Sequence, residues 1–140
     1  MKQFFLLIGF MCLTGCATPA YKMTDTDLVW EEKVVAAPLQ VVYDRLISGF
    51  RDDDQADPAG AINPDTKEAV IDIYLRGYRN TIAPWTIGII KLTPVSDSKT
   101  LVRAGINEGN LYFYGKGYLR QEWLAIAAGA EAGVNSRRDE

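Results

Sequence analysis

Between residues 39 and 50, the apolar side chains recur at the spacing of a single helical face. Residues three and four positions apart lie on the same side of an α-helix, so this series predicts a helix with one wide apolar face. Pro38 suits its first turn, because the N–H that proline lacks would be unpaired there. The polar face lacks the row of Lys and Arg typical of a membrane-surface helix, so we expect packing across a sheet. The apolar residues are Leu39, Val42, Tyr43, Leu46, Ile47 and Phe50.

Two-residue periods, which are typical of strands, lie on both sides of this helix. The turn at 94–98 joins two of them, which predicts a hairpin over 85–106. Residues 51–65 are rich in Asp, Pro and Gly and are predicted to form a loop. The predicted strands cover residues 28–35, 68–76, 85–93, 99–106 and 111–114.

A second helical face near the C-terminus completes the predicted fold. It contains Leu119, Trp123, Ile126, Ala127 and Ala130. We therefore predict an α+β fold, in which an antiparallel sheet of about four to five strands packs against the two helices. We expect a single domain over residues 28–134, followed by a polar tail at 135–140.

The first sixteen residues carry the parts of a bacterial export signal. Lys2 precedes an apolar run over residues 4–13, which is too short to span a bilayer because a spanning helix needs roughly 20 residues. The following Leu13-Thr14-Gly15-Cys16 resembles the lipobox of bacterial lipoproteins. This resemblance implies cleavage before Cys16 and acylation of that cysteine on its sulfur and its amine. The alternative is an ordinary secretory signal, which usually ends in a small-residue pattern such as Ala-x-Ala.

The lipobox defines the expected organisation of the N-terminus. Residues 1–15 would be a signal peptide, and residues 16–27 would be a lipidated tether. Cys12 would leave with the signal, so the mature chain would have no free thiol and no disulfide. Because Ala17 rather than aspartate follows the cysteine, the family's sorting rule implies the outer membrane, facing the periplasm, in a host that has one.

Composition removes several classes of function. The chain contains no histidine, which excludes Ser-His-Asp and Cys-His catalytic sets and metal sites with imidazole ligands. Its 15 basic and 18 acidic residues give a net charge of −3, so we expect no nucleic acid partner. The residues suggest no nucleophile, base or metal set. We therefore expect no enzymatic activity, no cofactor and no metal.

Acidic residues offer two further candidate sites, one in the predicted loop and one in a predicted strand. Asp52, Asp54 and Asp57 could surround Ca²⁺, but Asp57 and Asn63 occupy the positions where an EF-hand loop needs glycine and glutamate. The favoured interpretation is a solvated loop, with Ca²⁺ binding at 52–57 left open.

Asp72 lies between two isoleucines in the predicted 68–76 strand. Arg76 is too distant along the same strand to form a close pair with it. Arg103 is the cross-strand partner that the sequence offers, and the favoured interpretation is either a solvent-facing strand charge or a modest cross-strand ion pair.

Aromatic residues gather in the C-terminal half of the chain. Their usual role is core packing, but an aromatic wall with a few polar tips is also typical of ligand sites. The segment 77–85 has the composition of a protein contact. The predicted ligand or partner contacts are Tyr74, Tyr78, Arg79, Trp85, Tyr112, Tyr114 and Trp123.

The order of elements resembles, in outline, the helix-grip folds of the START and polyketide-cyclase-like superfamily. The residues that carry the resemblance are 34–43, at the first strand-to-helix step, and 119–124, in the last helix. Members of that superfamily have more strands and a longer final helix. The resemblance implies an apolar cavity between sheet and helix, suited to a lipid or another hydrophobic molecule.

Two functions follow from these observations. The preferred one is a non-catalytic envelope lipoprotein that acts as a binding or assembly module, held at the membrane by its lipid and in contact with another envelope protein. The alternative is a carrier or sensor of a hydrophobic small molecule in an aromatic-lined, helix-grip-like cavity.

Overall fold

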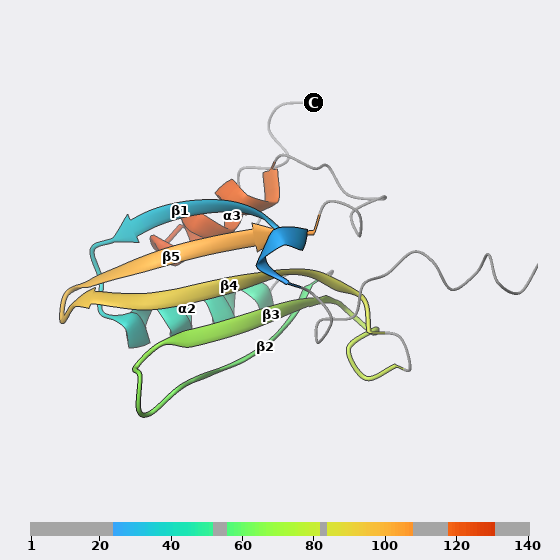
Figure 1. The fold of residues 1–140 in the computed structure, drawn as a ribbon, viewed down its shortest axis with the longest axis horizontal. Helices are drawn as coiled ribbons and strands as arrows, with labels where there is room; N and C mark the ends of the chain where they lie inside the picture. The colour runs from blue at the N-terminus through green and yellow to red at the C-terminus, as the bar shows by residue number, and fades with distance from the viewer. Residues whose placement is uncertain (1–23, 52–55, 82–83, 108–117, 131–140) are drawn as a thin grey trace, which may run out of the picture.

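One antiparallel sheet and two helices make up the described part of the chain (Figure 1). The computed structural model describes residues 24–51, 56–81, 84–107 and 118–130. This arrangement confirms the predicted α+β class. In chain order the elements are a 3₁₀ turn η2 (Asp25–Asp27), β1 (Val29–Val35), α2 (Leu39–Arg51), β2 (Ala56–Ile62), β3 (Ala69–Leu75), β4 (Thr86–Ser96), β5 (Lys99–Ile106) and α3 (Tyr118–Ala127).

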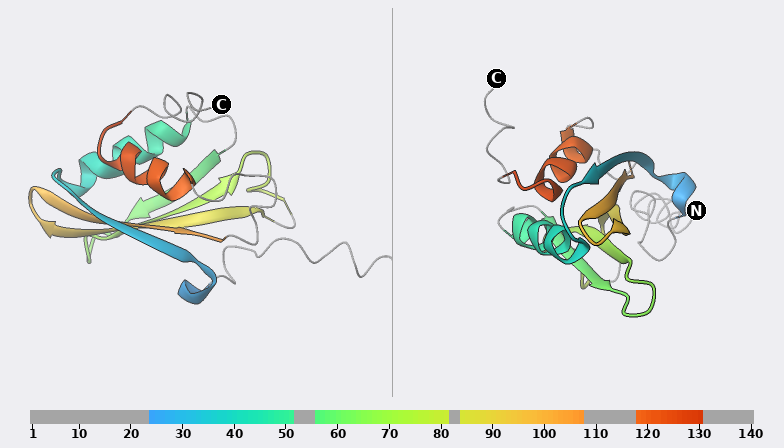
Figure 2. Two further views of the ribbon diagram at one scale, coloured as in Figure 1. Left: turned by 90° about the horizontal axis from the view of Figure 1, so that it is seen from above. Right: turned by 90° about the vertical axis from the view of Figure 1, so that its left-hand side faces the viewer.

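The sheet has five strands in the order β1-β5-β4-β3-β2, and every neighbouring pair is antiparallel. β4 and β5 form the predicted hairpin, whereas β1 and β2 are the edge strands. Both helices lie on the same side of the sheet (Figure 2). We call the side with the helices the helix face and the other side the open face.

Strand register assigns each side chain to one of these two faces. Successive residues of a strand point to opposite faces, and directly paired residues share a face. On β3, Ile71 and Ile73 are fully buried toward the helices, and the alternating Asp72 and Tyr74 lie on the open face. One row across the open face consists of Trp30, Gly105, Ile89, Asp72 and Ala59, from β1 to β2.

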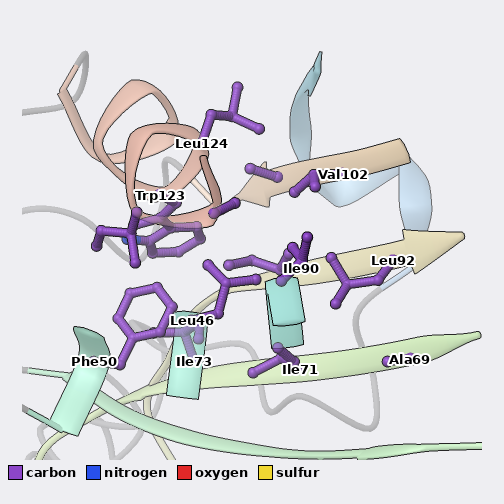
Figure 3. Close-up of a cluster of buried hydrophobic side chains, with 14 of the residues drawn as sticks. Leu46, Phe50, Ala69, Ile71, Ile73, Ile90, Leu92, Val102, Trp123 and Leu124 are labelled. Carbon is purple, nitrogen blue, oxygen red and sulfur yellow. The ribbon is translucent and has the colours of Figure 1, made fainter. Parts of the chain in front are cut away.

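The hydrophobic core fills the space between the sheet and the helices (Figure 3). α2 buries Val42, Leu46 and Phe50, three members of the predicted apolar face. From α3, Trp123 meets the Phe50 ring edge-on, with ring centroids 5.5 Å apart and planes at 86°. Gly88 of β4 makes room for this packing, because a Cβ there would lie 3.0 Å from the Trp123 ring.

The predicted loop over 51–65 is wrong for its central part, because residues 56–62 form the edge strand β2. Its sequence, ADPAGAI, contains residues that are rare in central strands. An edge strand tolerates them: a proline removes no hydrogen bond when its nitrogen faces away from the sheet. Pairing with the apolar β3, rather than local propensity, stabilises β2.

Three side chains donate the hydrogen bonds that fasten the helix α2 and the segment before it to the sheet. The Arg76 guanidinium donates from Nη2 to the carbonyl oxygens of Phe50 at 3.4 Å, Arg51 at 3.3 Å and Ala56 at 2.9 Å, which caps the end of the helix. The Tyr43 hydroxyl donates to the Gly60 carbonyl at 2.8 Å. The buried Thr100 hydroxyl donates to the Ala37 carbonyl at 2.9 Å.

Candidate partner-contact site

Four of the seven predicted contact residues come together where β3 ends and β4 begins. We call Tyr74, Tyr78, Arg79 and Trp85 the aromatic cluster. A turn after β3 brings them together: the Tyr78 N–H donates to the Leu75 carbonyl at 3.0 Å, and the Leu75 N–H donates to the Trp85 carbonyl at 2.8 Å. Gly77 adopts φ +86° in this turn, a backbone conformation that favours glycine.

Side chains of the aromatic cluster contact one another and β2. The Tyr78 and Trp85 rings pack edge to face with centroids 6.2 Å apart. Arg79 Nη1 lies 3.6 Å from Asp57 Oδ1. The two side chains are 44% and 34% exposed, so this ion pair adds little stability. Tyr78 is 46% exposed. The cluster therefore presents an aromatic surface with one cation to the solvent.

Asp72 lies beside the cluster on the open face, one pleat from Tyr74. Burial raises the pKa of the Asp72 carboxyl above its usual value. Burial also raises the pKa of the Tyr74 hydroxyl, with a further contribution from the Asp72 charge. The predicted partner of Asp72 is wrong: β4 lies between β3 and β5, and Arg103 pairs instead with Glu32 at 2.7 Å. No described residue forms an ion pair with Asp72.

The raised pKa of Asp72 predicts a pH-dependent effect of Asp72→Asn. A carboxyl whose pKa is higher in the folded than in the unfolded state contributes stability at low pH that is lost as the pH rises through the folded pKa. The neutral amide avoids that loss, so the variant should be more stable at pH 7, by less than about 1 kcal/mol because solvent screens the site. The difference should vanish near pH 3.

Urea unfolding at both pH values measures this effect, and Asp65→Asn in the exposed β2–β3 connection is the matched control. A variant that is less stable than the wild type at pH 7 would show that the Asp72 charge is favourable in the native state.

A second polar arrangement occupies the β1 side of the open face. The Trp30 ring lies over Gly105, where a Cβ would approach the ring to 2.7 Å. Arg103 and Lys91 stand 4.8 and 5.2 Å from the ring centroid. Lys91 Nζ also lies 2.7 Å from Asp25 Oδ1, and the indole N–H donates to the Asp25 carbonyl at 2.9 Å. Its cations are already paired, so this arrangement fastens η2 to the sheet.

Sequence reasoning missed the Trp30 arrangement and the role of Asp57. The alternation of Trp30 with charged residues in β1 was a usable signal, since it places the ring on the same face as Glu32. Asp57 gave no such signal, because its position opposite Tyr74 depends on β2, which was predicted to be loop.

The remaining predicted contacts do not join the aromatic cluster. Trp123 is 2% exposed and lies in the core on the helix face, so it cannot contact a partner on the open face. Tyr112, Tyr114 and the lipidation site Cys16 lie outside the described residues, as do residues 52–55 of the acidic segment.

An open hollow of about 460 Å³ lies at the opposite end of the sheet from the aromatic cluster, and no predicted contact residue lines it. The lining residues of the hollow are Leu39, Gln40, Ile62, Lys67, Pro94, Val95, Ser96 and Asp97.

Within the described residues, no three acidic or cysteine side chains gather as metal ligands would. None of the helices that the structure describes is long and apolar enough to cross a membrane.

Comparison with protein-family models, with curated proteins and with solved structures finds no match to this chain.

Proposed function

We propose that this chain is a non-catalytic envelope lipoprotein whose folded domain binds another envelope protein through the aromatic cluster. The observation that carries the proposal is the lipobox-like Leu13-Thr14-Gly15-Cys16 directly after a short apolar run. An acylated Cys16 would hold the domain at a membrane, and in a two-membrane host we infer the periplasmic side of the outer membrane. Three acyl chains would be enough for stable anchoring, since a single chain binds only marginally.

The tether sets how far the domain can reach. Because η2 (Asp25–Asp27) is fastened to the sheet, the expected tether is shorter than 16–27. The nine residues 16–24 would span at most about 32 Å when fully extended, because each residue adds about 3.3–3.6 Å. A partner of the domain must therefore lie in the same membrane or within the combined length of the tether and the domain from its surface. This restriction favours an envelope protein.

The open face supports a binding function. Both described helices lie on one side of the sheet, and among the described elements only η2 lies on the other side, away from the aromatic cluster. Tyr, Trp and Arg are enriched in the central, tightly bound parts of protein interfaces, and all three occur in the aromatic cluster. The half-buried Asp72 beside it would gain from a cationic or hydrogen-bond-donating group of a partner.

The alternative function, a carrier of a hydrophobic molecule, needs space between sheet and helices. Among the described residues, core side chains such as Phe50, Ile90 and Trp123 occupy that space. No observation therefore favours the carrier over the binding module.

Site-specific photocrosslinking in intact cells tests the binding face. A photoreactive residue at position 78 or 79 should give an adduct with a single envelope protein, because these side chains are exposed within the aromatic cluster. A photoreactive residue at position 95 is the matched control, since Val95 is 56% exposed at the opposite end of the sheet. The same adduct should be lost in Trp85→Ala.

Equal adducts at positions 78 and 95, or an adduct at 78 that persists in Trp85→Ala, would contradict the assignment of the cluster.

A further inference from the structure

The two edges of the sheet differ in how they are protected against pairing with another strand. Unpaired backbone groups at an edge are a template for a further strand, and proteins usually block them. On β2, Pro58 has no N–H to donate, and the Gly60 carbonyl already accepts the Tyr43 hydroxyl at 2.8 Å. The β2 edge is therefore poorly suited to pairing.

The β1 edge has neither of these devices. Its seven residues contain no proline or glycine, and all seven pair with β5 on the inner side. Within the described residues, no strand pairs with the outer side of β1. Val29 is 42% and Val34 53% exposed. The edge is therefore regular and in full register, and no other strand of the described chain covers it.

We propose that β1 pairs antiparallel with β1 of a second copy of this chain, with Glu32 at the twofold axis. A twofold axis perpendicular to the sheet keeps both open faces on one side, so each residue must meet a residue of the same face. The register centred on Glu32 meets this condition and pairs the whole strand from Val29 to Val35. It would join the two sheets into one continuous sheet.

Charge complementarity selects the second copy as the occupant. In this register Glu31 faces Lys33 of the partner subunit, and the pair occurs twice. Lys33 is exposed and forms no ion pair with any other described residue. Glu31 Oε2 lies 3.7 Å from Arg120 Nε of α3, at an exposure of 41% that leaves room for a second cation.

The open face of the pairing is also compatible. Two Glu32 side chains would meet at the axis. Within each subunit, however, Arg103 Nε lies 2.7 Å from the Glu32 carboxylate and offsets its charge. Trp30 would face Val34 of the partner subunit, which would cover an exposed apolar side chain. A shift of the register by two residues in either direction places two Glu31 or two Lys33 side chains opposite each other and shortens the pairing.

Cysteine crosslinking of the full chain in membranes tests this geometry. Directly opposite residues of antiparallel strands have Cα atoms about 4.5–5.5 Å apart, which is within the range of a disulfide. Glu32→Cys should therefore give a covalent dimer under mild oxidation. Ala59→Cys, at the centre of the β2 edge, is the matched control, and the unsubstituted chain reports any crosslinking through its own cysteines.

A monomeric Glu32→Cys chain, or equal dimer yields from Glu32→Cys and Ala59→Cys, would overturn the proposal.

Charge reversal provides a second test that a folding defect cannot imitate. Lys33→Glu makes both of the Glu31–Lys33 pairs across the interface acidic, and Glu31→Lys makes both basic. Each variant alone should therefore dimerise about tenfold more weakly, as measured by native mass spectrometry in detergent. An equimolar mixture should recover the wild-type dimer fraction as heterodimers, because every pair is then of opposite charge. A mixture no better than the separate variants, or wild-type dimerisation of Lys33→Glu alone, would contradict the register.

The pairing uses only the folded domain, so its failure would leave the proposed lipid anchor unaffected.

Discussion

Replacing Trp123 with alanine is expected to lower the free energy of unfolding by about 3–5 kcal/mol, the usual cost of removing a buried aromatic side chain. The indole is 2% exposed and packs edge-on against Phe50 at 5.5 Å. Gly88 presses against the ring from β4, and a strand backbone cannot collapse into the space that alanine would leave. Urea unfolding followed by far-ultraviolet circular dichroism measures the change.

Trp85→Ala is the matched control, because both tryptophans were predicted to contact a ligand or partner. Trp85 is half-buried at the sheet end and has its ring contact with Tyr78. Its loss should cost no more than about 1.5 kcal/mol in stability while removing the photocrosslink at position 78. A Trp123→Ala chain as stable as Trp85→Ala would show that the indole of Trp123 is not part of the core.

Substituting Cys16 with serine is expected to abolish acylation of the chain. The resemblance to the lipobox implies acylation of Cys16 on its sulfur, which serine lacks, and processing that depends on this cysteine. Labelled fatty acid supplied to cells should therefore not enter the variant above background. The chain should also migrate as the larger precursor that retains residues 1–15, and gel mobility with in-gel detection of the label measures both effects.

Cys12→Ser is the matched control for this substitution. Cys12 lies four residues earlier, inside the apolar run, and the lipobox assigns it no role. This variant should be labelled and processed as the wild type is. Equal labelling of Cys16→Ser and the wild type, or loss of labelling in Cys12→Ser, would mean that the lipobox assignment is wrong.

The elements with a strong period were predictable from the sequence. The residues of α2 repeat one apolar face over three turns, and β3 alternates between buried isoleucines and open-face residues. Every boundary of these two elements therefore lies within one residue of its predicted position. β2 was not predictable, because Ala, Pro and Gly carry no strand period. Its pairing depends on β3, which lies beyond a connection at 63–68.

The candidate site was predictable in part. Its composition indicated the aromatic cluster around Tyr78 and Trp85. Periodicity alone did not place Trp123, because an aromatic residue on a helical face fits a core and a contact equally well. The Asp72–Arg103 pair failed for a different reason: side-chain pairing across a sheet depends on strand order, and long-range contacts determine that order.

The mass of the N-terminal peptide, released by protease from the wild-type chain purified from membranes, tests the central claim most directly. The proposed function predicts a peptide that begins at Cys16 and carries three acyl chains. A peptide that still contains residues 1–15, or one that begins elsewhere with no lipid on Cys16, would contradict it.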